Sequence, residues 1–174
     1  LFGQFAWTIE NMYFNVFLYN TISQDSGYIA AMVALSAITA TFTTLFMGTV
    51  SDRIGRRKPF MTWGYVIWAL TVAAFAFVSP SSMKSVGVAA TMVVVLDCVM
   101  TFFGSTANDA VFNAYVTESV EKERRTKVES VIQIMPMAAM LIVFGVLDGF
   151  TQRGEWRTFF LITAFIMLIA GILS

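Results

Sequence analysis

Three carboxylic acids lie within long apolar stretches of the sequence. Glu10 lies in the first such stretch, and Asp97 and Asp109 lie in the fourth. A charged side chain at the centre of a bilayer costs about 2.5–3.5 kcal/mol on insertion scales, so such residues usually have a function. No Lys, Arg or His lies near the middle of these stretches, and a buried carboxylate without a cation tends to take up a proton. The acids therefore favour proton or cation binding; the alternative is a protonated acid that only hydrogen-bonds a neighbouring helix.

Other polar residues accompany these acids at helical spacing. Gln4, Asn11, Asn15 and Tyr19 fall within about 80° of each other around a helix. The fourth stretch carries a second stripe made of Asp97, Thr101, Gly104, Ser105, Asn108 and Phe112, with Asp109 at its edge. In lipid such stripes must face protein or water, so they predict the wall of a cavity; the alternative is hydrogen bonding between helices. The candidate solute-binding or ion-binding residues are Glu10, Asn11, Asn15, Tyr19, Asp97, Thr101, Asn108, Asp109 and Asn113.

The elements that must position these side chains are membrane helices. Of the 174 residues, 57% are hydrophobic and 13% are charged, which is too apolar for a soluble domain of this size. Apolar runs of about 20 residues indicate helical spans, since open sheets leave unpaired backbone groups in lipid. We expect an all-helical bundle with six spans, at about 4–23, 28–50, 60–79, 86–117, 128–147 and 157–174. The fourth run exceeds the bilayer thickness, and a bend is expected near Gly104 and Ser105.

The basic residues lie in the joints between these runs. The second and fourth joints hold eight of the eleven Lys and Arg residues, and the third holds Lys84 beside Pro80. The positive-inside rule therefore places joints two and four, and the N-terminus, in the cytoplasm. We expect a multi-pass protein of the plasma membrane, in bacteria the inner membrane. A weak echo between 48–56 and 145–154 suggests a 3+3 inverted repeat.

The second joint carries the most informative motif, Gly48-Thr49-Val50-Ser51-Asp52-Arg53-Ile54-Gly55-Arg56-Arg57-Lys58-Pro59. Gly48 permits close helix packing, and Gly55 permits a turn with positive φ. Asp52 lies at a helix C-terminus, where the helix dipole disfavours an anion. It therefore needs a cation, and Arg53 and Arg56 are nearby. A basic topology anchor alone would explain neither the glycines nor Asp52.

This joint resembles the signature loop of the major facilitator superfamily, Gly-x-x-x-Asp-Arg-x-Gly-Arg-Arg, at every named position. The resemblance implies a secondary transporter with twelve helices, of which residues 1–174 would form the N-terminal six-helix half. In that family the loop is a latch between the halves, so the resemblance assigns this role to Gly48, Asp52, Arg53, Gly55, Arg56 and Arg57. The expected partners are a small-molecule solute, the lipid bilayer and the C-terminal half, and no cofactor is expected.

A narrower likeness concerns one branch of that family. The run 53–60 is similar to the loop of the glycoside-pentoside-hexuronide cation symporters, and 108–115 is similar to their fourth helix. The branch usually carries two Asp residues in its second helix that hold Na⁺, and the matching positions here are Ala40 and Thr44. The likeness implies a sugar or glycoside substrate, and Trp7, Tyr13, Tyr19 and Tyr115 offer aromatic faces for one. The coupling ion, H⁺ or Na⁺, stays open.

Other functional classes fit the sequence less well. The net charge is zero, whereas nucleic-acid binding calls for a basic surface. The chain has one Cys and no His, which leaves no His-based catalysis or zinc site and predicts neither an enzyme nor a metal site. The main alternative to transport is a helical membrane module that scaffolds or regulates a partner.

Overall fold

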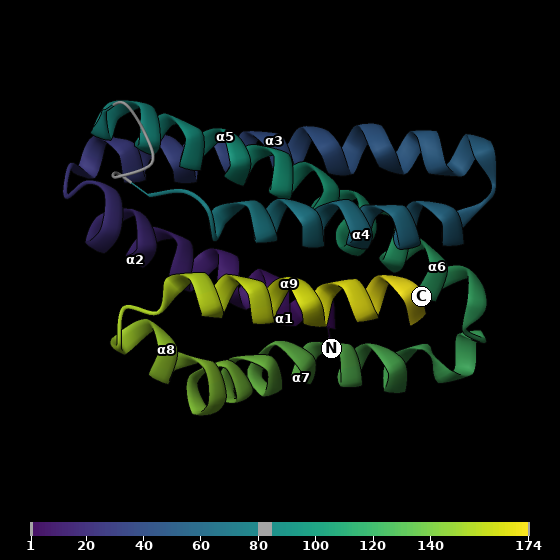
Figure 1. Ribbon diagram of the computed structural model, residues 1–174. Coiled ribbons are helices and arrows are strands. Elements are labelled where there is room, and N and C mark those ends of the chain that lie inside the picture. Colours follow the sequence, from purple (N-terminus) through teal and green to yellow (C-terminus); the bar gives the residue numbers. More distant parts are fainter. Residues whose placement is uncertain (1, 80–84, 174) are drawn as a thin grey trace.

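The computed structural model describes residues 2–79 and 85–173, and within these ranges it is helical without a strand (Figure 1). The expected all-helical class is therefore confirmed. Pro80 and Lys84 of the third joint lie outside the described residues. The helices form six consecutive runs. The first run consists of α1 (Phe2–Ile9), η1 (Glu10–Phe14), α2 (Asn15–Phe17) and η2 (Leu18–Ile22), the second is α3 (Ser26–Ile54), and the third is α4 (Arg57–Phe75). The fourth run consists of α5 (Val86–Gly104), η3 (Ser105–Phe112) and α6 (Asn113–Ser119), the fifth of η4 (Lys122–Arg124), α7 (Arg125–Ile142), η5 (Val143–Leu147) and α8 (Asp148–Gln152), and the sixth is α9 (Trp156–Leu173).

Local sequence signals set several helix ends. Asp25 caps α3 by accepting a hydrogen bond from the Gly27 backbone N–H at 2.8 Å, as N-cap carboxylates do. Gly55 ends α3 with a φ of 67°, the left-handed conformation that glycine adopts most readily at this position. Pro59 lies in the first turn of α4, where its missing N–H has no helical partner to lose.

Four of the six runs are long and apolar enough to cross a membrane among the described residues. They are Ser26–Ile54, Val86–Ser119, Lys122–Gln152 and Trp156–Leu173. The other two runs are more polar than these four: the first carries Glu10 and four amides, and α4 begins with Arg57 and Lys58. The structure thus contains six helical runs, and length and composition alone qualify four of them as membrane spans.

At the place where a bend is expected in the fourth run, the helix changes type. The α-helix ends at Gly104, and the π-helical segment η3 follows. A Cβ on Gly104 would lie 2.9 Å from the ring of Trp68, so the glycine lets α5 and α4 pack closely at that point. π-helical turns are rare in proteins, and those that occur are often found at functional sites.

An aromatic core joins the first run to α4 and α9. Phe14 packs edge-to-face on Phe75, with ring centroids 4.3 Å apart, and Phe17 packs likewise on Phe160 at 4.9 Å. Figure 1 shows α9 lying along the first run, with α7 on one side of the bundle and α3 with α5 on the other. This core fixes the position of the first run, whose polar side chains are the candidates for a site.

Candidate functional site

A cavity of about 200 Å³ lies between the first run, α3 and α5. Its wall consists of Trp7, Glu10, Asn11, Asn15, Met32, Val33, Ser36, Ala37, Ala40, Asp97 and Thr101. Five of the nine predicted binding residues are therefore brought together here: Glu10, Asn11, Asn15, Asp97 and Thr101. We call this hollow the upper cavity.

The two acids of the upper cavity are buried and bonded to hydroxyl groups. Glu10 is 6% exposed and Asp97 is 2% exposed. Thr101 donates its hydroxyl hydrogen to Glu10 Oε1 at 2.8 Å, and the Ser36 hydroxyl donates to Asp97 Oδ2. Glu10 Oε2 has no hydrogen-bond partner among the described residues. Two acids with neutral donors, and no Lys or Arg in the cavity wall, form a site that can take up a proton or a small cation.

The backbone changes helix type at Glu10. Glu10 is the first residue of η1, and a second π-helical segment, η2, follows within the same run. A regular spacing of 100° per residue therefore does not extend along this run. Tyr19, expected on the same face as Asn15, is 45% exposed and is not in the upper cavity wall.

A second hollow, the lower cavity, has a volume of about 300 Å³. It is lined by Gly3, Gln4, Met61, Tyr65, Asn108, Phe112, Ile132, Met135, Ala170 and Leu173. Tyr65 donates to Asn108 Oδ1 at 3.3 Å, and the Asn108 amide donates to Asp109 at 3.3 Å. A Cβ on Gly3 would lie 2.1 Å from Asn108 Oδ1, so a glycine is required where the first run meets this pair. The polar stripe of the fourth run thus divides between two cavities.

The aromatic residues expected around the solute have separate positions. Trp7 lines the upper cavity. Tyr13 is 4% exposed, packs on Phe159 in the core and donates to Asp148 Oδ1 at 2.9 Å. Tyr115 packs against the small cluster formed by Met61, Ala110 and Val111. The structure therefore brings Trp7 to the cavity and uses Tyr13 for packing.

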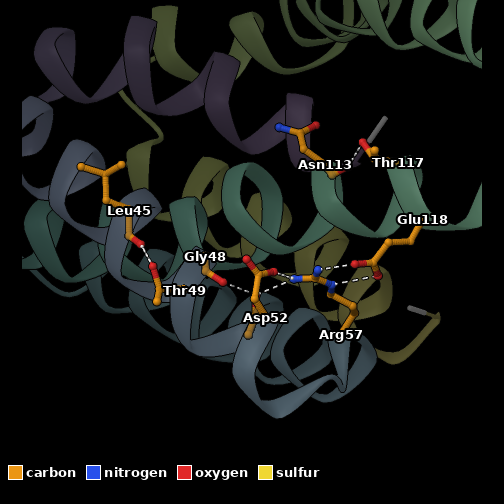
Figure 2. Close-up of polar contacts among 9 residues, drawn as sticks. Leu45, Gly48, Thr49, Asp52, Arg57, Asn113, Thr117 and Glu118 are labelled. Atoms are coloured by element: carbon orange, nitrogen blue, oxygen red, sulfur yellow. Dashed lines mark hydrogen bonds and ion pairs between the residues drawn. The ribbon is translucent and has the colours of Figure 1, made fainter.

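The signature motif forms a charge cluster centred on Arg57 (Figure 2). Arg57 Nη1 lies 2.7 Å from Asp52 Oδ1, and Arg57 also donates to both carboxylate oxygens of Glu118, at 2.5 and 3.1 Å. It donates to Ser51 Oγ at 2.7 Å as well. The expectation that Arg53 or Arg56 neutralises Asp52 is wrong, because the turn at Gly55 brings the first residue of α4 back to the end of α3.

This cluster links three helices. Asp52 belongs to α3, Arg57 to α4 and Glu118 to α6. The Arg57 side chain is 10% exposed, whereas those of Asp52 and Glu118 are 64% and 59% exposed. Hydrogen bonding to Glu118, opposed in part by burial, raises the pKa of Arg57 above its ordinary value. Asn113, predicted to bind solute, lies in the hollow of this cluster and in neither the upper nor the lower cavity.

Two residues of the cavities are new to the candidate set. Ser36 on α3 binds Asp97, and Tyr65 on α4 binds Asn108. Ser36 could have been found from the sequence, because it is a polar residue in an apolar run. Tyr65 could not, since a tyrosine in a membrane helix has many ordinary roles.

The family model of the Major Facilitator Superfamily matches residues 1–174. The chain belongs to the Major Facilitator Superfamily. No curated protein and no solved structure matches it. The family and the apolar helices together make it a multi-pass membrane protein of a transporter family. Members of this family are transporters and not enzymes, which fits the prediction that the chain is not an enzyme.

Proposed function

We propose that this facilitator-family protein is a secondary active transporter of a small polar solute, with the upper cavity as its solute and ion site. The observation that carries the proposal is the pair of buried acids on two helices, Glu10 and Asp97, held by hydroxyl donors beside the amides of Asn11 and Asn15. Amides and an aromatic face, here Trp7, suit a sugar or glycoside, because a sugar offers hydroxyl groups at its rim and C–H groups on its faces.

The coupling ion is proposed to be a proton or Na⁺. Glu10 Oε2 is buried without a partner among the described residues, and either ion would satisfy it. Transport would follow alternating access, in which two halves of a transporter rock about a site at the membrane midplane. In that scheme the two groups of three runs are inverted repeats, and the Arg57 cluster lies on the cytoplasmic side together with the N-terminus.

A second six-helix half is proposed to close the upper cavity. Asn11 and Tyr19 are exposed, and α3 and α7 carry large exposed apolar side chains that include Phe42, Leu45 and Leu141. The apolar side chains suit lipid or a neighbouring helix. The exposed amide beside the two acids suits neither lipid nor an apolar helix, so water, solute or a polar partner surface must face it.

Uptake into proteoliposomes tests the proposal. The full-length protein is reconstituted, and a panel of labelled D-glucose, D-galactose, methyl β-D-galactoside and D-glucuronate is offered under an imposed gradient of H⁺ or Na⁺. We expect accumulation of a panel member under one gradient. Asp97→Asn and Glu10→Gln should abolish accumulation while retaining exchange, and Glu129→Gln, at an exposed position of α7, should behave as wild type.

Two results would contradict the proposal. Failure of the reconstituted protein to accumulate any panel member under either gradient would favour the scaffold alternative. Full accumulation by both acid variants would make Glu10 and Asp97 structural residues.

A further inference from the structure

A third hollow opens between α3, α4 and the α5–η3 run, and it shares no residue with the upper or lower cavity. We call it the lateral groove. It has a volume of about 300 Å³ and is apolar except for one hydroxyl; its wall consists of Met47, Pro59, Phe60, Trp63, Gly64, Ile67, Phe102, Phe103 and Thr106. Trp63 is 64% exposed, so the groove is open at the surface of the six runs. An exposed apolar ring on a membrane protein suits lipid, and a lipid chain can reach the groove from this side.

The shape of the lateral groove follows from a close helix crossing. A Cβ on Gly64 would lie 2.7 Å from Ala107 Cβ and 3.3 Å from the Phe103 carbonyl oxygen. α4 and η3 therefore touch through small residues at this point. The bulkier side chains around the crossing, Phe60, Trp63 and Phe102, build the walls. The result is an apolar slot whose lining suits an alkyl chain.

One end of the lateral groove lies beside the basic joint. Pro59 and Phe60 line the groove, and Arg56 and Lys58 lie within four residues of both in the chain. Arg53, Arg56 and Lys58 are exposed, and in the ranges that the structure describes none of them is in an ion pair. The carboxylates of this region, Asp52 and Glu118, are both bound to Arg57. Asp52, Glu118 and Arg57 together leave one negative charge, so with Arg53, Arg56 and Lys58 this joint keeps a net charge of +2. Arg56 and Lys58 adjoin the groove residues in the chain.

We propose that the lateral groove binds an anionic phospholipid, with one acyl chain in the slot and the phosphate on Arg53, Arg56 and Lys58. The apolar wall suits any lipid chain, so the three charges decide the headgroup. Basic residues beside an anionic lipid surface strengthen binding by about fivefold each. The occupant is a bilayer lipid because the slot is reached from the hydrocarbon side. This inference does not rest on the proposed transport.

Fluorescence quenching of Trp63 by brominated lipid tests the proposal. The full-length protein is placed in phosphatidylcholine bilayers that contain a minor fraction of lipid with dibrominated chains, either phosphatidylglycerol or phosphatidylcholine. The residues 1–174 hold four Trp, so the Trp63→Phe protein is measured in parallel and subtracted. Because the chains are identical, a difference in quenching reports headgroup preference.

We expect phosphatidylglycerol to outcompete phosphatidylcholine at Trp63 by at least about tenfold, from about fivefold per basic residue. R53Q/R56Q/K58Q should remove the preference, and Lys58→Gln alone should reduce it severalfold. K122Q/R124Q/K127Q removes the same charge from exposed positions of the next basic joint and should keep the preference. Equal quenching by the two lipids in the wild type, or equal loss of preference in the two triple variants, would overturn the proposal.

Discussion

The hydrogen bond between Thr101 and Glu10 offers a direct perturbation of the upper cavity. Thr101→Val keeps the size and branching of the side chain but removes the donor that lies 2.8 Å from Glu10 Oε1. Thr101 is 1% exposed and Glu10 is 6% exposed, so water has little access to replace the lost donor. Since Glu10 Oε2 has no partner among the described residues, the variant leaves both carboxyl oxygens without one.

The expected magnitude has two parts. A hydrogen bond between membrane helices averages about 0.6 kcal/mol and reaches about 1.7 kcal/mol. A buried acceptor left without a donor adds a desolvation penalty of about 1–3 kcal/mol. We therefore expect Thr101→Val to lower the free energy of unfolding by about 2 kcal/mol, and Thr101→Ser, which restores the donor, to recover most of it.

Unfolding of the purified protein by sodium dodecyl sulfate in mixed micelles measures this difference. Thr163→Val is the matched control, because Thr163 is equally buried but donates to the Phe159 carbonyl of its own helix at 2.8 Å. That carbonyl still accepts a backbone hydrogen bond of its helix when the hydroxyl is removed, so the control should change the free energy of unfolding by well under 1 kcal/mol. Equal effects of the two substitutions would refute the assignment of a specific Thr101–Glu10 bond.

Two further predictions concern the lower cavity and the charge cluster. Gly3→Ala should destabilise the protein by about 1–3 kcal/mol through overpacking against Asn108, as measured by the same unfolding titration. Gly145→Ala is the control, because a Cβ there meets open space, and it should be neutral or stabilising. Equal changes in the free energy of unfolding for the two variants would contradict the packing described. Arg57→Gln should slow solute exchange severalfold in proteoliposomes without reducing membrane insertion, because it separates α3, α4 and α6; Arg124→Gln, which breaks an exposed pair with Glu121, should not, and unchanged exchange by the Arg57 variant would remove the latch role.

The helical class and the position of the motif could be predicted from the sequence because they depend on local properties. Apolar length and the lack of alternating polarity indicate helices in any membrane protein. The glycine at position 55 indicates a turn because few other residues adopt its conformation. Glu10 and Asp97 can be singled out from the sequence because placing an acid inside a bilayer costs free energy, however the helices pack.

The partners of these residues depend on packing between distant runs, which a single sequence does not specify. Ser36 meets Asp97 only because α3 packs on α5, and Arg57 meets Glu118 only because α4 packs on η3, which leads into α6. The position of Tyr19 was missed for another reason, since π-helical turns break the regular angular spacing on which the prediction rested.

Accessibility of the upper cavity from both sides of the membrane tests the central claim most directly. Asn11, exposed in that cavity, is replaced by Cys in a Cys98→Ser background, which removes the one native thiol of residues 1–174. A charged, membrane-impermeant thiol reagent is then applied to right-side-out and inside-out vesicles. Phe165→Cys, at a 64% exposed apolar position of α9, is the lipid-facing control. Alternating access predicts that Asn11→Cys reacts in both vesicle orientations and that Phe165→Cys reacts in neither; an Asn11→Cys thiol that reacts from one side only, or from neither, would contradict it.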